Sequence, residues 1–174
     1  DPQMSSRPDG SDSIPSAFRA TARRLAEQPA MLGAGGEWTF ARLDRESDSL
    51  AAGFLRLGIV PGARIGLYCP NSPEFASVYL AILKAGAVVV PVNVMLNPKE
   101  VAFVLADAGA TGLFYHAAFA DAAAQVREAA SGLELAVRIG DGPGEDPSLA
   151  EVAVPGGRPP EPVIEPGRDL AAIL

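Results

Sequence analysis

The stretch Leu80-Ala-Ile-Leu-Lys-Ala-Gly-Ala-Val-Val-Val-Pro-Val-Asn93 decides the fold. Its first half continues an apolar stripe at helical spacing, which is typical of an amphipathic helix. Gly86 ends that helix, because glycine readily takes the left-handed backbone that a helix C-terminus requires. The run 87–92 that follows is apolar without alternation until its end, as in a strand covered on both faces. The stretch therefore predicts a helix packed on a buried parallel strand.

The same alternation of predicted helices and strands continues on both sides of this stretch. The expected strands are 64–69, 87–92, 111–115 and 134–139, and the helices between them are expected to lie within 72–86, 97–109 and 119–130. A helix of this length carries the chain back to the end of the sheet where the previous strand began, which gives parallel pairing. We therefore predict the α/β class, with a doubly wound, mainly parallel sheet flanked by helices.

Two helices and a hairpin are expected before the sheet. The helices are predicted over 15–28 and about 40–57, and Ala30–Leu32 with Glu37–Thr39 form the hairpin between them. The polar start, 1–13, has no apolar stretch of the kind found in a signal peptide. Asp1-Pro-Gln3 before Met4 resembles a tag remnant, so we expect this start to be disordered or tag-like.

The composition changes after Ile139. Seven prolines lie between Asp141 and Arg168, which predicts an irregular surface segment with one short strand at 151–154. Asp169–Leu174 then indicates the beginning of another buried strand. The expected division is 1–13 as the tail, 14–140 as the α/β unit, 141–168 as the irregular segment and 169–174 as the start of a strand.

Composition and charge exclude several classes of protein. The 174 residues are 48% apolar and 20% charged, which is typical of a folded chain. Lys and Arg number 14 against 21 Asp and Glu, so the formal net charge of −7 argues against a nucleic-acid partner. One cysteine and one histidine exclude an internal disulfide and any metal site rich in these residues. The most apolar run, 79–96, contains Lys84 and Pro91, so we expect no transmembrane segment and a cytoplasmic protein.

Polar residues at the strand ends give weak signals for a site. A phospho-acceptor receiver domain needs a carboxylate at a strand end. Cys69, Asn93 and His116 occupy these positions instead, which argues against a receiver domain. Cys69 is more simply a small buried residue, and His116 a surface or capping histidine. Asn71 and Asn93 are expected to form turns.

The glycine-rich stretch Gly140-Asp-Gly-Pro-Gly-Glu145 does not predict a nucleotide site. Its spacing is G-x-G-x-G, and prolines follow it where a helix N-terminus would be needed. The neighbouring carboxylates would also repel a pyrophosphate. We expect an exposed, flexible loop.

Taken together, the segments resemble the opening of adenylate-forming (AMP-binding) enzymes, which include acyl-CoA synthetases, aryl-CoA ligases, luciferases and peptide-synthetase adenylation domains. The strongest match is Asn71–Phe75 followed by Leu80–Asn93. Weaker matches are Trp38–Leu43, Leu50–Leu55, Gly62–Leu67, Asn97–Glu100, Leu105–Asp107 and Asp169–Leu174. The last of these resembles the strand that leads into the phosphate loop of the family. Arg42 is a departure, because the family more often has an acid at this position.

The resemblance implies the N-terminal part of an acyl-CoA synthetase, most like a long-chain fatty-acid–CoA ligase of fatty acid metabolism, truncated just before the phosphate loop. This acid–thiol ligase would use ATP and Mg²⁺ to convert a small-molecule carboxylic acid into an acyl-adenylate, and CoA would then displace AMP. In the family the groups that act on the phosphates lie downstream. No catalytic, cofactor-binding or metal-binding residue is therefore expected in this chain, which alone should be inactive and bind no cofactor.

Two alternatives remain open. An adenylation domain or a fatty-acyl-AMP ligase shares the same motifs, and a non-catalytic, flavodoxin-like binding or interaction module shares the α/β pattern. For the truncated enzyme we also expect self-association, since strands missing from the sheet would leave an edge exposed.

Overall fold

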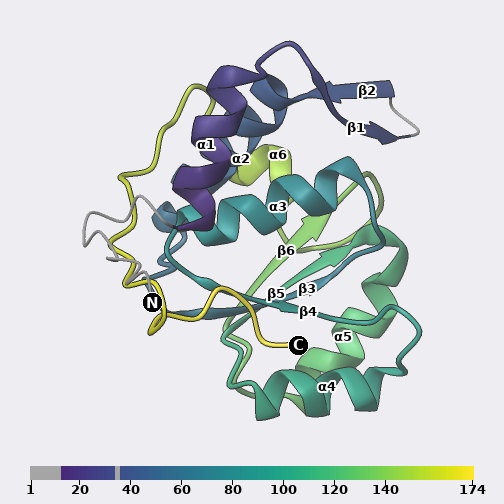
Figure 1. The fold of residues 1–174 in the computed structure, drawn as a ribbon. Helices are drawn as coiled ribbons and strands as arrows, with labels where there is room; N and C mark the ends of the chain where they lie inside the picture. Colours follow the sequence, from purple (N-terminus) through teal and green to yellow (C-terminus); the bar gives the residue numbers. More distant parts are fainter. Residues whose placement is uncertain (1–12, 34–35) are drawn as a thin grey trace.

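The computed structural model describes residues 13–33 and 36–174, which build a four-stranded parallel sheet in the order β4-β3-β5-β6 (Figure 1). The strands are β3 (Arg64–Tyr68), β4 (Val88–Pro91), β5 (Gly112–His116) and β6 (Leu135–Ile139). In the register of the sheet, Ile65 of β3 lies between Val89 of β4 and Gly112 of β5. The predicted fold class is confirmed. Residues 1–12 of the tag-like tail predicted at 1–13 lie outside the described residues, whereas Ser13 is buried and caps α1.

Helices cover both faces of the sheet (Figure 1). One face carries α1 (Ile14–Arg24), α2 (Phe40–Arg56), α3 (Pro73–Lys84) and the short α6 (Leu149–Val152). The other face carries α4 (Pro98–Asp107) and α5 (Ala120–Ala129), and a 3₁₀ turn, η1 (Ala117–Phe119), precedes α5. The predicted hairpin is confirmed as the antiparallel pair β1 (Pro29–Gly33) and β2 (Gly36–Thr39), beside the N-terminal end of α3.

Successive side chains of each strand point to opposite faces of the sheet, so they contribute to two separate hydrophobic cores. Leu67 and Phe114 pack under α2 and α3, whereas Leu113 packs under α4 and α5. Gly66 allows α4 to approach closely, because a Cβ at this position would lie 2.5 Å from Cδ2 of Leu105. This explains why a glycine stands inside a buried strand.

Local sequence signals set most helix boundaries. Thr39 and Ser72 cap α2 and α3, each accepting a backbone N–H with its hydroxyl oxygen. Asn97 and Glu100 form a capping box at the start of α4. Gly86 takes the predicted positive φ of 77° just after α3.

The first helix is shorter than predicted. It ends at Arg24 rather than near Gln28, and the carbonyl of Gln28 instead accepts the N–H of Phe40 at 3.0 Å. Pro29 disfavours helical geometry at the residue before it. The chain therefore leaves the helix early and turns into the hairpin.

The short strand predicted at 151–154 is wrong, because this region contains α6. The hydroxyl of Ser148 accepts the N–H of Glu151, and the Glu151 carboxylate in turn accepts the N–H of Ser148 at 2.8 Å. This reciprocal capping box begins a helix, and it outweighs the alternating pattern of Glu151-Val-Ala-Val154 that suggested a strand.

The buried strand predicted at 169–174 is reduced to one parallel bridge, between Ala172 and Val89. The Val89 N–H donates to the carbonyl of Ala171, and the Ile173 N–H donates to the carbonyl of Val89, both at 3.0 Å. Leu174 is fully exposed. Pro91 has no N–H with which to extend this outer ladder, so pairing on this edge of β4 is short.

Candidate functional site

The carboxyl edge of the sheet is where ligands bind in open α/β folds, above all where neighbouring strands lead to opposite sides. Here this point lies between β3 and β5, because β3 leads outward to β4 and β5 leads outward to β6. Cys69 follows β3, and His116 is the last residue of β5. Asn93 follows the adjacent edge strand, β4. The topology therefore brings the three weak candidates to one edge of the sheet.

Cys69 is inert at this edge. Its side chain is buried, and its Sγ lies 3.4 Å from the carbonyl oxygen of Pro70. Burial raises the pKa of the thiol to about 11. Because the thiolate is the nucleophilic form, a thiol that stays protonated at neutral pH does not attack a substrate. The prediction that Cys69 is a small buried residue is confirmed.

His116 and Asn93 both serve the local backbone. His116 Nδ1 accepts the N–H of Ala118 at 3.2 Å and so caps the 3₁₀ turn. Asn93 Oδ1 accepts the N–H of Met95 at 3.0 Å and stabilises a turn. These capping and turn roles agree with the prediction from the sequence. Neither contact joins one strand end to another, so the three candidates do not form a common catalytic group.

The glycine-rich loop after β6 is fastened by ionic and polar contacts rather than left free. The Tyr115 hydroxyl donates to Asp146 Oδ2 at 2.8 Å, and Arg127 Nη1 donates to both Asp146 carboxylate oxygens at 2.8 and 3.1 Å. Arg138 donates to the carbonyl of Gly142. Burial and the nearby Asp146 raise the pKa of Tyr115 to about 12. Arg127 and Arg138 thus bind the loop itself. These contacts restrain a loop that the sequence predicted to be flexible.

A buried charge cluster joins α1, α2 and α3, and its geometry was not predicted from the sequence. Lys84 is 1% exposed, and its Nζ donates to Asp44 Oδ1 at 2.7 Å, to Ser47 Oγ at 2.8 Å and to Asp48 Oδ1 at 2.8 Å. The same Asp48 oxygen accepts Arg19 Nη2 at 2.7 Å. The sequence did contain one signal for this cluster. Asp44 and Asp48 are four residues apart, so they share one face of a helix and could together bind a buried cation. Because its donors are saturated, Lys84 is not free to contact a phosphate.

A shallow apolar groove of about 360 Å³ lies between the hairpin and α3. Phe75 and Tyr79 line it together with Met31, and their rings lie 6.0 Å apart. Both aromatic side chains are only partly buried, because they face this groove. By contrast, Val78, Ile82 and Leu83 of the same helix are buried.

Arg42, which departs from the expected acid, has a contact of its own. Its guanidinium carbon lies 4.0 Å from the centre of the Trp38 ring, as in a cation–π interaction. Arg42 also donates its backbone N–H to Thr39. The departure therefore leaves the start of α2 intact.

Across residues 13–33 and 36–174, no three His, Cys, Asp or Glu side chains gather in a way that could hold a metal ion. Within the same described ranges, no helix has the length and apolar character needed to cross a membrane.

Comparison with known proteins identifies the family to which the chain belongs. The model of the AMP-binding enzyme family matches residues 18–174. Long-chain fatty acid transport protein 1 of Rattus norvegicus is 39% identical over 119 residues, covering 67% of this chain and 18% of that protein. A long-chain-fatty-acid–CoA ligase of Salmonella typhimurium is 34% identical over 136 residues, covering 77% of this chain and 24% of that protein. The chain thus spans less than a quarter of the length of these two curated relatives.

Solved structures agree with the sequence relatives. A long-chain-fatty-acid-CoA ligase from Archaeoglobus fulgidus superposes with a TM-score of 0.82 and 26% identity, over 92% of this chain and 33% of that chain. A Mycobacterium tuberculosis fatty acyl CoA synthetase gives a TM-score of 0.81 and 28% identity, over 95% and 32% of the two chains. The resemblance found in the sequence is confirmed, and the chain belongs to the family of AMP-binding enzymes.

Proposed function

We propose that the chain is the N-terminal scaffold of an ATP-dependent acyl-CoA synthetase, most like a long-chain fatty-acid–CoA ligase. The observation that carries this proposal is the family match over residues 18–174, combined with relatives whose names are those of fatty-acid–CoA ligases. The whole enzyme would convert a carboxylic acid and ATP into an acyl-adenylate and pyrophosphate. CoA would then form the thioester and release AMP, and Mg²⁺ would accompany ATP.

Several polar side chains of this chain are already engaged within the protein, which supports this proposal. A site for ATP needs donors and cations directed at phosphates. Lys84 is instead saturated by acceptors inside the protein, Arg127 is bound to Asp146, and the Cys69 thiol is buried. We therefore place the catalytic, nucleotide and metal-binding residues of the enzyme outside this chain. On this proposal the chain alone is inactive and contributes the sheet on which the rest of the enzyme is built.

The test is an assay of the protein encoded by the reading frame continued beyond Leu174. We expect pyrophosphate release that depends on a fatty acid, followed by AMP release and thioester formation when CoA is added. Acyl-adenylate formation with no thioester on CoA, but transfer to the thiol of a carrier protein, would indicate the adenylation-domain alternative. A stop codon directly after Leu174 would instead favour the non-catalytic module.

The cytoplasmic location drawn from the sequence stays a prediction. The sequence does not define the acyl substrate, and a panel of acids of increasing chain length in the same assay would define it.

A further inference from the structure

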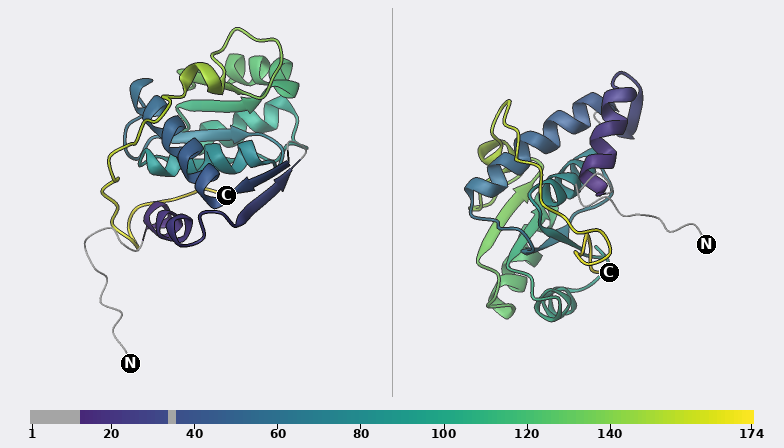
Figure 2. Two further views of the ribbon diagram at one scale, coloured as in Figure 1. Left: turned by 90° about the horizontal axis from the view of Figure 1, so that it is seen from above. Right: turned by 60° about the vertical axis from the view of Figure 1, so that its left-hand side comes forward.

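The Pro-rich segment 155–168, which we name the strap, crosses the outside of α1 and leads to the open edge of the sheet (Figure 2). Before it, the Val154 N–H donates to the carbonyl of Ser49 at 3.0 Å. After it, Ala171 accepts the N–H of Val89. Between these two anchors, no backbone hydrogen bond joins the strap to another element within the described part of the chain. The strap must therefore be held by its side chains.

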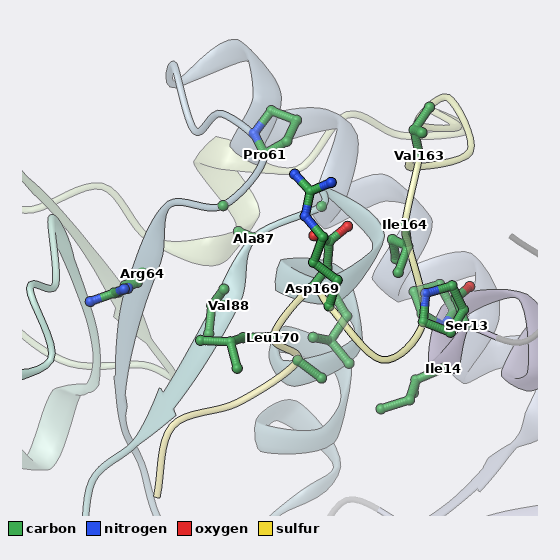
Figure 3. Close-up of a pocket in the computed structure, with 17 residues that line it drawn as sticks. Ser13, Ile14, Pro61, Arg64, Ala87, Val88, Val163, Ile164, Asp169 and Leu170 are labelled. Atoms are coloured by element: carbon green, nitrogen blue, oxygen red, sulfur yellow. The ribbon is translucent and has the colours of Figure 1, made fainter. Parts of the chain in front are cut away.

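Packing under the second half of the strap is incomplete. A cavity of about 440 Å³ separates this part of the chain from the sheet and from the start of α1. Figure 3 shows Val163 and Ile164 on one side, with Pro61 and Val88 on the other. Val163 is 95% exposed, so it contributes little apolar burial to hold the strap. Apolar contact alone is a weak fastening in this region.

One charged contact fastens the strap near its middle. Arg19 of α1 forms an ion pair with Glu161, and among the described residues this is the one ion pair that links the strap to another element. The Arg19 side chain is 15% exposed, and its second nitrogen is held by Asp48, which Lys84 also contacts. The buried charge cluster therefore fixes the direction in which Arg19 meets Glu161.

We propose that the Arg19–Glu161 pair is a latch that seats residues 169–174 on the outer edge of β4. The latch draws its rigidity from the Asp48–Lys84 cluster beneath it and acts through the strap on the bridge at Val89. Opening the latch exposes this edge of the sheet while leaving the rest of the sheet in place. The latch is a positioning device, and it does not depend on the proposed enzymatic activity.

Two neighbouring amides of β4 make the latch measurable. The Val89 N–H donates outward to Ala171, whereas the Val88 N–H donates inward to the carbonyl of Ala63 at 2.8 Å. Hydrogen exchange at Val89 therefore reports whether the C-terminal segment is seated, and exchange at Val88 reports opening of the sheet itself. A variant truncated after Arg168 calibrates the reporter, since it should release protection at Val89 alone. If protection at Val89 survives this truncation, the bridge is absent and the proposal is overturned.

The decisive experiment compares Glu161→Gln with Glu165→Gln in the 174-residue chain by amide hydrogen exchange and NMR. The control removes the same charge from the same strap, but Glu165 pairs only with Arg168 inside the C-terminal region. Because a partly exposed ion pair contributes up to about 1 kcal/mol, Glu161→Gln should lower protection at Val89 by about two- to fivefold. Protection at Val88 should not change, and Glu165→Gln should affect neither amide. Unchanged protection at Val89, equal loss in the control, or equal loss at Val88 would each overturn the latch.

Discussion

Lys84 is a buried cation that ties α3 to α2 in the helical layer above the sheet. A buried cation is tolerated only where its hydrogen bonds and charge are satisfied, and Asp44, Ser47 and Asp48 provide this from a single helix. Asp48 also pairs with Arg19 of α1, so the cluster as a whole connects three helices. Its role is to fix how α1, α2 and α3 lie against one another.

Replacing Lys84 with methionine should therefore destabilise the fold despite the similar size of the side chain. The change leaves Asp48 buried with one cation fewer, and removing one partner of a buried ion pair costs about 3–5 kcal/mol. Because Arg19 still contacts Asp48, we expect about 3 kcal/mol, the lower end of that range. Urea unfolding measures this loss. Lys99→Met, at an exposed lysine of α4, is the control and should change the free energy of unfolding by less than about 0.5 kcal/mol.

Cys69 gives a prediction about pH. Its thiol pKa rises from an ordinary value of 9.0 to about 11 because of burial. The folded state therefore holds this proton more tightly than the unfolded state does. The resulting stabilisation is complete below about pH 9 and is lost as the pH rises toward 11. Between these values the stability of the protein should fall more steeply than that of Cys69→Ala, and parallel stability curves for the two proteins would contradict this assignment.

At the scale of the elements, α2 and α6 approach each other closely. A Cβ on Gly53 would lie 2.1 Å from the carbonyl oxygen of Val152, so no side chain fits at this position. Alanine would normally favour a helix by up to about 1 kcal/mol over glycine. Here the collision with backbone should reverse the sign, and we expect Gly53→Ala to destabilise the protein by about 1–3 kcal/mol.

Thermal unfolding of Gly53→Ala should be compared with that of Gly132→Ala. A Cβ at Gly132 meets only the carbonyl of Ala110, at an ordinary 3.7 Å. A neutral Gly132→Ala and a destabilised Gly53→Ala would support the close approach of α6. A stabilised Gly53→Ala would show that α6 does not pack against α2 as described.

Local chemistry explains which elements could be predicted from the sequence. The helix that starts at Pro98 was predictable, because Asn97, Pro98 and Glu100 are local signals that act within one turn. The helix at Leu149–Val152 was missed because the Ser148–Glu151 capping box was not weighed against an alternating pattern. The order of the strands and the partners of Lys84 could not be obtained this way. They depend on contacts between residues far apart in the chain, such as Lys84 and Asp48, 36 positions apart.

In the molecule as a whole, apolar surface remains next to an incompletely paired sheet edge. Met95 is 86% exposed and Phe103 of α4 is 72% exposed. Among residues 13–33 and 36–174, only Val89 of β4 is paired on its outer side. Exposed strand edges and apolar surface promote association. We therefore expect the chain to form dimers or larger assemblies, with the size measured by light scattering over a range of concentrations.

Replacing exposed apolar residues with lysine tests which surface forms the contact between copies of the chain. Phe103→Lys should reduce it, whereas Leu32→Lys, at an exposed residue of the hairpin, should leave it unchanged. A clean monomer at high concentration in the unmodified chain would contradict the prediction. Equal effects of the two substitutions would place the contact elsewhere.

The central claim is that this chain provides the sheet and helical layers of an AMP-binding enzyme, while the groups that hold the nucleotide lie outside it. Isothermal titration of the 174-residue chain with ATP and Mg²⁺ tests this claim most directly. The account predicts no saturable heat of binding at millimolar nucleotide. Saturable binding in the micromolar range would contradict it, because the chain would then contain a nucleotide site of its own.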